Sequence, residues 1–385
     1  MKKERWLPLS LLSVLLFSIP FFFFVSGWLL FGAFVPLLFL EDRVLSWQRL
    51  QRGVLSFMPG GNGRPDDSAN GKSGQTAASQ KPVRYWKGWL WYVILTFALF
   101  NIWTSYWVKH AAWVGVIAAV VVNTLYMTLV FWLFHVTRRR LGDRLGYASL
   151  VVYWITFEFL YLRAQINFPW LVLGNGFAND VRLIQWYEWT GTLGGSLWVL
   201  VVNILLFRLI RAWIARNSKK EPAAARPVAA AETSGPASPG KSGAHRAKAN
   251  RGRIVWLAGV LLIPVIVSLV RFSTYKEKED PYEIVILQPN IDPYVKFIDM
   301  PQAEQTRLLL QVADSLVRSS TDYIVGPETF INNGVWEEDI ATHPEILKLY
   351  EFLRPFPRAK MVIGATTSRL YTDPADFTET SRPVR

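Results

Sequence analysis

Long runs of residues without charge dominate the first 270 positions of the chain. Each run is about as long as the roughly 20 residues that a helix needs to cross the hydrocarbon core of a membrane. The pattern predicts a membrane domain over residues 1–275 with about seven transmembrane helices: 7–24, 26–40, 88–108, 111–134, 145–162, 189–207 and 254–270. A cleaved signal peptide is the alternative for the first run, because Val25-Ser26-Gly27 loosely resembles a cleavage site. The apolar run continues to Leu40, which favours two short uncleaved spans.

The pattern changes after residue 281, where short β-branched runs alternate with amphipathic segments. Three of these runs predict buried strands: 282–287, 322–328 and 360–365. One helix is expected to begin at Pro301 and another to span 344–352. The first of these helices is predicted to bury Leu308, Val312 and Leu316 on its apolar face. Strands that alternate with amphipathic helices indicate an α/β domain over residues 282–385.

Two segments between the predicted spans have a biased composition. Residues 59–80 are rich in Gly, Ser and Asn, and residues 218–252 are rich in Ala, Pro, Ser and Lys. Neither segment holds enough apolar residues to bury a core, so both are predicted to be disordered cytoplasmic loops.

Basic residues fall on alternate connections between the predicted spans, for example at Arg138–Arg140 and from Arg208 to Arg253. Because loops rich in Lys and Arg stay in the cytoplasm, the amino terminus is predicted to be cytoplasmic. Seven crossings then place the chain after Arg271 on the outer side of the membrane. The net charge of +13 is therefore mostly a signal of topology, and binding of nucleic acid is not expected.

The sequence contains no cysteine. Disulfides, thiolate metal ligands and a cysteine nucleophile are thus excluded for these 385 residues. The four histidines are scattered without the spacing of metal ligands. We expect no metal and no cofactor.

One predicted outer loop, between the fifth and sixth spans, is aromatic and apolar but too short and too broken by Pro and Gly to cross the membrane. It contains Phe168 and Trp170 and is expected to lie at the outer membrane interface. Such a loop predicts either simple aromatic anchoring or contact with a lipid substrate. Glu158 lies about one and a half helical turns before Arg163. It is either a functional intramembrane carboxylate or a local partner of Arg163.

The predicted strand 322–328 ends in Gly326-Pro327-Glu328. A strand that passes into a loop holds a catalytic group in place and leaves it accessible. Glu328 is therefore a candidate active-site carboxylate, and the alternative is an ordinary solvated or turn-capping glutamate.

Several short motifs follow one another along the chain: Phe168-Pro169-Trp170 with Leu173-Gly174, then Gln185 and Trp189-Thr190-Gly191, then Leu287-Gln288-Pro289-Asn290-Ile291 with Lys296, then Gly326-Pro327-Glu328, then Ile363-Gly364. Their order resembles that of bacterial apolipoprotein N-acyltransferases. The resemblance covers nearly the whole chain apart from the two segments of biased composition. It implies a polytopic helical membrane domain followed by the amino-terminal part of a nitrilase-type (carbon–nitrogen hydrolase) domain, an α-β-β-α sandwich.

The resemblance also implies an activity. Such enzymes transfer an acyl chain from a membrane phospholipid to the amino-terminal diacylglyceryl-cysteine of an apolipoprotein, through a Glu-Lys-Cys triad and a thioester acyl-enzyme. Glu328 matches the catalytic glutamate, and Phe168, Trp170 and Phe297 are implied to contact lipid; the family usually has tryptophan at the position of Phe297. The implied protein is a monomer in the bacterial inner membrane, with its nitrilase-type domain in the periplasm.

The chain departs from the family after Glu328. Neither Lys348 nor Lys360 lies in the context of the catalytic lysine, and the catalytic cysteine has no counterpart in these 385 residues. We expect the chain to be the amino-terminal part of a longer enzyme and to be inactive as written. An incomplete sheet is expected to leave an unpaired strand edge and exposed apolar faces. The alternatives are a catalytically dead membrane scaffold or lipid-binding fragment, and a membrane-anchored nitrilase-type amidase.

Overall fold

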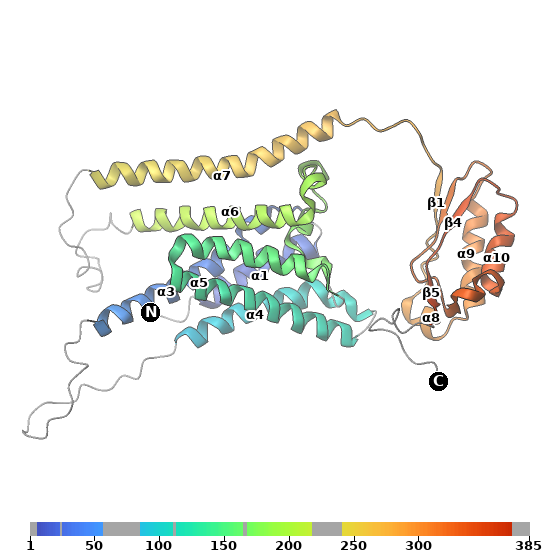
Figure 1. Cartoon of the computed structure of the whole chain (residues 1–385), viewed down its shortest axis with the longest axis horizontal. Helices are drawn as coiled ribbons and strands as arrows, with labels where there is room; N and C mark the ends of the chain where they lie inside the picture. The colour runs from blue at the N-terminus through green and yellow to red at the C-terminus, as the bar shows by residue number, and fades with distance from the viewer. Residues whose placement is uncertain are drawn as a thin grey trace, which may run out of the picture. The chain divides into compact units, whose positions relative to one another are not determined.

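The computed structural model describes residues 6–23, 25–56, 85–110, 113–164, 168–217 and 241–371. They belong to two compact units, Met1–Tyr275 and Lys276–Arg385 (Figure 1). The loop predicted at 59–80 and most of the loop predicted at 218–252 lie outside the described residues. Residues 241–252 instead form the start of helix α7 (Lys241–Thr274). The predicted loop therefore ends before Lys241, because the segment that follows is rich in the helix formers Ala, Lys and Arg.

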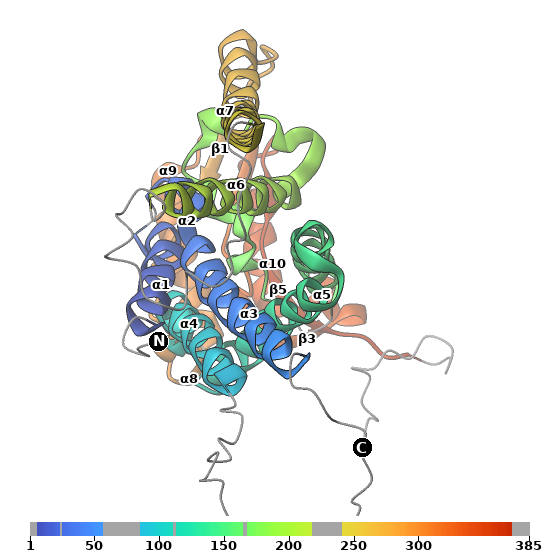
Figure 2. The same ribbon diagram turned by 90° about the vertical axis from the view of Figure 1, so that its left-hand side faces the viewer.

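The first unit is helical, and most of its helices overlap predicted apolar runs. Its elements before α7 are α1 (Trp6–Phe22), η2 (Gly27–Leu29), α2 (Leu30–Ala33), α3 (Val35–Ser56), α4 (Tyr85–Ser105), η3 (Tyr106–His110), α5 (Trp113–Tyr161), η4 (Pro169–Leu171), η5 (Leu173–Phe177), η6 (Val181–Leu183) and α6 (Tyr187–Asn217). The run predicted as one span at 26–40 is instead divided among η2, α2 and the start of α3, which continues to Ser56. Helix α3 contacts α4, α5 and α6 and lies inside the bundle that they form (Figure 2).

Helix α5 is a hairpin of two helical arms. Gly142 has a φ of +83° and interrupts the helical backbone. The hydroxyl of Tyr161 donates a hydrogen bond of 2.5 Å to Oδ1 of Asn123. In a straight helix these two residues would lie roughly 57 Å apart, so the arms fold back on each other. The spans predicted at 111–134 and 145–162 correspond to the two arms, which glycine joins because it tolerates a positive φ.

Among the described residues, four helical segments are long and apolar enough to cross a membrane: Gly88–His110, Trp113–Tyr161, Tyr187–Asn217 and Arg251–Thr274. Helix α1 is apolar but shorter. These four segments include both arms of α5 as one segment. The topology of seven spans stays a prediction.

A buried amide supports the break between α2 and α3. Asn203 of α6 accepts a hydrogen bond of 2.8 Å from the backbone N–H of Phe34, and its amide donates to the carbonyls of Leu30 and Val199 at 2.7 and 2.8 Å. Irregular backbone at membrane depth needs such internal partners, because lipid offers none. Phe34 itself packs edge-on against Phe17 and Trp154, each with ring centres 4.8 Å apart.

Charged side chains of α3, α5 and α6 meet inside the first unit. Arg138, whose side chain is fully buried, donates to Glu41, to Asp42 at 2.6 Å and to Asp143 at 3.1 Å. Arg211 donates to Asp42 at 2.8 Å and to Asp143 at 3.0 Å. Mutual pairing offsets the high cost of burying each charge alone.

The second unit is an α/β arrangement. Its elements are β1 (Ile284–Ile286), α8 (Pro293–Ile298), α9 (Gln302–Leu316), β2 (Tyr323–Val325), β3 (Ile331–Trp336), η9 (Glu337–Thr342), α10 (Pro344–Leu353), β4 (Lys360–Val362) and β5 (Ala365–Ser368). Strands β1, β2 and β4 form a parallel sheet in that order, and β3 pairs with β5, also in parallel. The three predicted strands are all present, each in a shorter form, but the prediction that they are buried is wrong for β1 and β4, whose side chains on one face are exposed.

One face of the three-stranded sheet is covered and the other is open. Ile324 of β2 packs with Leu309 and Ala313 of α9 and with Leu349 of α10. Large apolar side chains on the open face are exposed: Ile284, Ile286 and Val362. The expected exposed apolar face is therefore present in the described residues.

Candidate functional site

The carboxyl ends of the parallel strands bring the predicted residues of the second unit together. Glu328 follows β2, the middle strand, while Lys296 follows β1 and Gly364 follows β4. Because parallel strands end at the same edge of a sheet, the segments after them converge there. Glu328 is exposed at this edge and thus accessible.

A tight backbone contact sets the position of Glu328. The N–H of Gly364 donates to the carbonyl of Pro327 at 3.2 Å, and the N–H of Phe330 donates to the carbonyl of Gly364 at 2.9 Å. A Cβ atom on residue 364 would lie 2.5 Å from the N of Thr329 and 2.9 Å from the Cα of Glu328. Glycine at 364 is therefore required for the two segments to approach each other. Thr329 has a φ of +50°, which marks a sharp turn directly after the glutamate.

Lys296 is the cation beside Glu328. Its Nζ donates to the backbone carbonyl of Glu328 at 3.4 Å and lies 5.0 Å from the ring centre of Phe297. Partial burial lowers the pKa of Lys296, and the negative charge of Glu328 opposes this shift. Sequence reasoning placed Lys296 in a motif but gave it no role, because its approach to Glu328 depends on β1 and β2 being neighbours.

Phe297 presents its ring to solvent, since it is 59% exposed on the short helix α8. The structure thus places Lys296, Phe297 and Glu328 at one edge of the sheet, with the lysine in contact with both partners. An exposed aromatic ring next to a carboxylate can offer apolar contact to a substrate.

The two predicted residues of the aromatic loop in the first unit differ in exposure. Phe168 is partly buried against the helical core. Trp170 is 58% exposed and packs edge-on against Trp107 of η3, with ring centres 5.8 Å apart. Trp107 was not predicted as a site residue, because it lies in another loop and its sequence context offers no signal beyond its aromatic side chain.

Glu158 holds the base of this loop. Its Oε1 accepts hydrogen bonds of 2.9 Å from the backbone N–H of Leu173 and from Nε1 of Trp154. Pairing with Arg163, one of the two alternatives for Glu158, is not among the ion pairs of the described residues. The guanidinium of Arg163 instead lies 3.8 Å from the ring centre of Phe159. The loop folds back, so the backbone N–H of Leu173 takes the place that Arg163 would have at the carboxylate of Glu158.

Gly174 locks the loop against α6. Its N–H donates to Oγ of Ser196 at 3.0 Å, and its carbonyl accepts from the hydroxyl of Tyr187 at 3.0 Å. A Cβ atom on residue 174 would lie 1.9 Å from the carbonyl oxygen of Thr192. The loop that carries Trp170 is therefore held at a fixed place on the helices.

Comparisons with known proteins find similar sequences for part of the chain. Residues 76–205 match the family model described as "Apolipoprotein N-acyltransferase N-terminal domain". An apolipoprotein N-acyltransferase from Chlorobaculum tepidum is 25% identical over 244 residues, which cover 63% of this chain and 39% of that protein. One from Geobacter metallireducens is 25% identical over 194 residues, which cover 49% of this chain and 32% of that protein. The chain is an apolipoprotein N-acyltransferase-like protein.

The family match includes the aromatic loop, Glu158 and Gly174, and it ends before Glu328. The chain spans less than two fifths of the length of the curated relatives that it matches. The family model therefore does not cover the residues around Glu328.

Proposed function

We propose that the chain takes part in the phospholipid-dependent N-acylation of the amino-terminal diacylglyceryl-cysteine of apolipoproteins. The observation that carries the proposal is that one chain joins two features. Its membrane unit matches the amino-terminal domain of this family, and its second unit presents Glu328 at the carboxyl edge of a parallel sheet. The acyl donor is a membrane phospholipid, and the acceptor is a lipidated apolipoprotein.

Trp170, Phe168 and Phe297 contact the apolar parts of the two lipidic substrates in this proposal. Support comes from the exposure of Trp170 and Phe297 and from the rigid base of the loop at Gly174. A fixed aromatic side chain at the interface lowers the entropic cost of orienting an acyl chain. Phe168 supports the loop from its partly buried position.

Glu328 acts as the general base of a nitrilase-type Glu-Lys-Cys triad. It takes the proton of a cysteine thiol, and the thiolate attacks the lipid ester to give a thioester and a lysophospholipid. The α-amino group of the acceptor then attacks the thioester and releases the thiol. These 385 residues hold no cysteine, so the chain as written forms no thioester.

The proposed location is the bacterial inner membrane, with the amino terminus in the cytoplasm and the second unit in the periplasm, as a monomer. Support comes from the apolar helices and from the alternating placement of basic loops. This orientation puts Glu328 on the side where lipidated apolipoproteins are exposed.

A chimera tests the proposal. Residues 1–385 replace the matching segment of the Chlorobaculum tepidum relative, and acyl transfer from phosphatidylethanolamine to a synthetic diacylglyceryl-cysteine peptide is followed by mass spectrometry. We expect transfer by the chimera and none by the chain alone. Glu328→Gln should lower the rate by about 10²–10⁴-fold, the contribution of a positioned general base.

The matched control is Glu337→Gln, which removes an acid of the same unit outside the sheet-edge site. Its rate should stay at that of the unsubstituted chimera. A folded chimera that binds phospholipid but transfers no acyl chain would support the lipid-binding scaffold instead. A Glu328→Gln chimera with an unchanged rate would remove Glu328 from the chemistry.

A further inference from the structure

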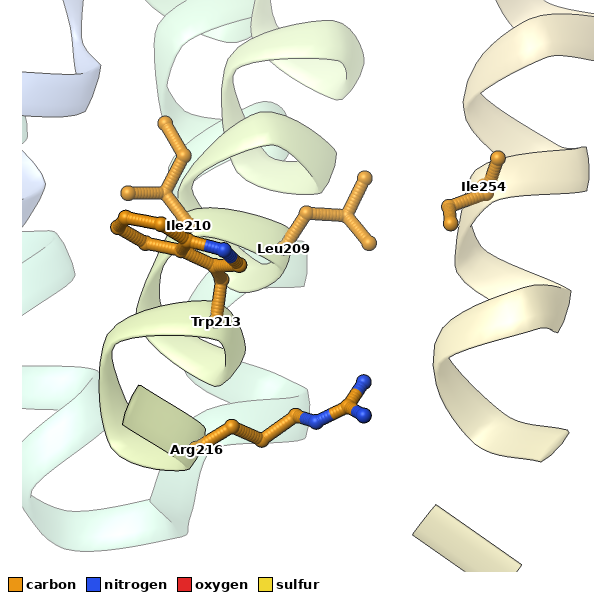
Figure 3. Close-up of a pocket in the computed structure, with 5 residues that line it drawn as sticks. All are labelled: Leu209, Ile210, Trp213, Arg216 and Ile254. Atoms are coloured by element: carbon orange, nitrogen blue, oxygen red, sulfur yellow. The ribbon is translucent and has the colours of Figure 1, made fainter. Parts of the chain in front are cut away.

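Helices α6 and α7 enclose two neighbouring cavities that the proposed reaction does not use. The larger has a volume of about 600 Å³, and its lining includes Leu197, Trp198, Val201, Trp256, Val260 and Ile263. The smaller has a volume of about 340 Å³ and is lined by Leu209, Ile210, Trp213, Arg216 and Ile254 (Figure 3). Both volumes lie in the range of small-molecule sites, roughly 300–1,000 Å³.

The two cavities follow one another along a single seam. Ile254 of α7 lines the smaller cavity and its neighbour Val255 lines the larger. The lining starts at Trp186, directly before α6, continues on the helix from Gly194 and ends at Arg216, one residue before the carboxyl end at Asn217. Apart from Arg216 the side chains that line the seam are apolar, so its occupant must be apolar along most of its length.

A proline explains how α7 is held beside the seam. Pro264 has no N–H to donate to the carbonyl of Val260, and Nε1 of Trp198 donates to that carbonyl at 2.7 Å instead. Oγ of Ser268 donates to the carbonyl of Leu183 at 2.8 Å. Both contacts lie in the half of α7 that ends at Thr274. Before this half, the apolar side chains of Ile254, Val255 and Trp256 are exposed, and Trp256 is 71% exposed.

Positive charge gathers where the seam reaches the end of α6. Arg216 is exposed and its guanidinium points towards α7 (Figure 3). Arg253 lies one residue before Ile254 on α7. The positive charges of Arg208 and Arg211 act on it there. Arg216 is the one charged side chain among the described residues that line the two cavities, and it lies at this end of the seam. Arg253 does not line a cavity but directly precedes the lining residue Ile254.

We propose that the seam binds one anionic phospholipid, with an acyl chain between α6 and α7 and the headgroup phosphate at Arg216 and Arg253. Guanidinium groups recognise phosphate through charge-assisted hydrogen bonds, and anionic lipids are attracted to basic residues at a helix end. This lipid is distinct from the acyl donor in the proposal, because its headgroup lies at Arg216 near the carboxyl end of α6, whereas the aromatic loop is attached at the amino end of α6 through Tyr187. The predicted orientation places the bound lipid in the inner leaflet.

Native mass spectrometry of the purified full chain in detergent tests the site. The chain is titrated with phosphatidylglycerol and with phosphatidylcholine of the same acyl composition. We expect one phosphatidylglycerol to bind more tightly than phosphatidylcholine. The double substitution Arg216→Gln/Arg253→Gln should weaken phosphatidylglycerol about thirtyfold, since each arginine near an anionic headgroup contributes about a factor of five.

The matched control is Arg139→Gln/Arg140→Gln. It removes the same charge from exposed positions of α5, close in sequence to Asp143, which pairs with Arg211 of α6. The affinity for phosphatidylglycerol should change by less than about twofold, because neither residue lines the two cavities and exposed charges are screened. Ile254→Trp keeps both arginines and fills the smaller cavity, so it should also weaken binding.

A photoreactive group on the acyl chain identifies the place of binding. Phosphatidylglycerol with a diazirine in its acyl chain should label peptides that contain residues 209–216 or 254–263. Equal affinity for the two lipids, or unchanged affinity after Arg216→Gln/Arg253→Gln, would overturn the proposal. Crosslinks from a photoreactive residue at position 213 to a polypeptide helix, in place of lipid, would also overturn it.

Discussion

The two units of the molecule differ in how completely they bury their polar and apolar side chains. The membrane unit buries whole ion pairs, such as Arg138 with Glu41, inside an aromatic core. The α/β unit covers one face of its sheet with α9 and α10 and leaves Ile286 on the other face 72% exposed. A buried charge depends entirely on its protein partners, whereas an open sheet face remains in contact with its surroundings. Substitutions of similar size should therefore have very different effects in the two units.

The largest effect is expected at Arg138. Arg138→Met leaves Glu41 buried with only His135, at 2.9 Å, among the partners found in the described residues. Removal of one member of a buried ion pair costs about 3–5 kcal/mol. Thermal unfolding of the full chain in detergent should show a large loss of stability. Arg139→Met, at the exposed neighbouring position, is the control and should leave the midpoint nearly unchanged. Equal midpoints for the two variants would mean that the buried network contributes nothing.

A pair of isoleucines tests the two faces of the sheet. Ile324 is fully buried beneath α9, while Ile286 lies on the open face. Ile324→Ala should destabilise the second unit by about 2–5 kcal/mol, the usual cost of a core cavity. Ile286→Ala should change stability by less than about 0.5 kcal/mol, as at other surface positions. Hydrogen exchange of the β2 and α9 amides in the full chain measures the stability change in each variant. Strong protection losses in Ile286→Ala would show that another part covers this face.

Gly174 tests how firmly the aromatic loop is held on the membrane unit. Gly174→Ala places a Cβ 1.9 Å from the carbonyl oxygen of Thr192, a backbone atom that cannot rotate away. Such overpacking costs about 1–3 kcal/mol, and amide exchange of residues 168–177 should accelerate. Gly259→Ala is the control, because its Cβ meets Ile263 Cδ1 at an ordinary 3.8 Å. Unchanged exchange in Gly174→Ala would mean that the loop is not fixed at this point.

The local pattern was enough to predict the elements but not their contacts. The β-branched runs predicted β1, β2 and β4, since buried parallel strands need apolar residues on both faces. The helix α9 was predicted to bury Leu308, Val312 and Leu316, yet Leu309 and Ala313 are its buried apolar residues and Leu316 is exposed. The apolar face is shifted because two polar side chains of α9 are buried too. Gln305 donates to backbone carbonyls at 2.8 and 2.9 Å, which a hydrophobic pattern does not register.

The same limit applies to the candidate site. The position of Glu328 after a strand could be predicted from Gly326-Pro327, because these residues end a β run. The approach of Lys296 to Glu328 depends on strand order, which no local window contains. Pairing with the nearby Arg163 was one of two alternatives for Glu158, but the carboxylate accepts from the backbone N–H of Leu173 because the loop folds back.

The smallest effect is expected at Asp322, at the opposite edge of the sheet from Glu328. Its carboxylate accepts a hydrogen bond of 2.9 Å from the N–H of Glu283 and pairs with Arg358. These contacts lower the pKa of Asp322 below its ordinary value of 3.8, the hydrogen bond from Glu283 being the largest cause. The ionised form is therefore the one that the fold stabilises. Its contribution is fully present above about pH 4 and is lost as pH falls through the lowered pKa.

Asp322→Asn keeps an acceptor for the N–H of Glu283 and removes the charge that faces Arg358. The variant should melt a few degrees below the unsubstituted chain near neutral pH, as expected for a partly exposed pair. The difference should shrink as pH falls below about 4, because the native carboxylate is then protonated as well. Calorimetry of the full chain over this range measures it, with Arg307→Gln as the control at an exposed pair on α9. A difference between Asp322→Asn and the unsubstituted chain that stays constant with pH would assign the effect to lost packing. The charge would then contribute nothing, and the α/β unit would lack the dependence on ionised partners that the membrane unit has at Arg138.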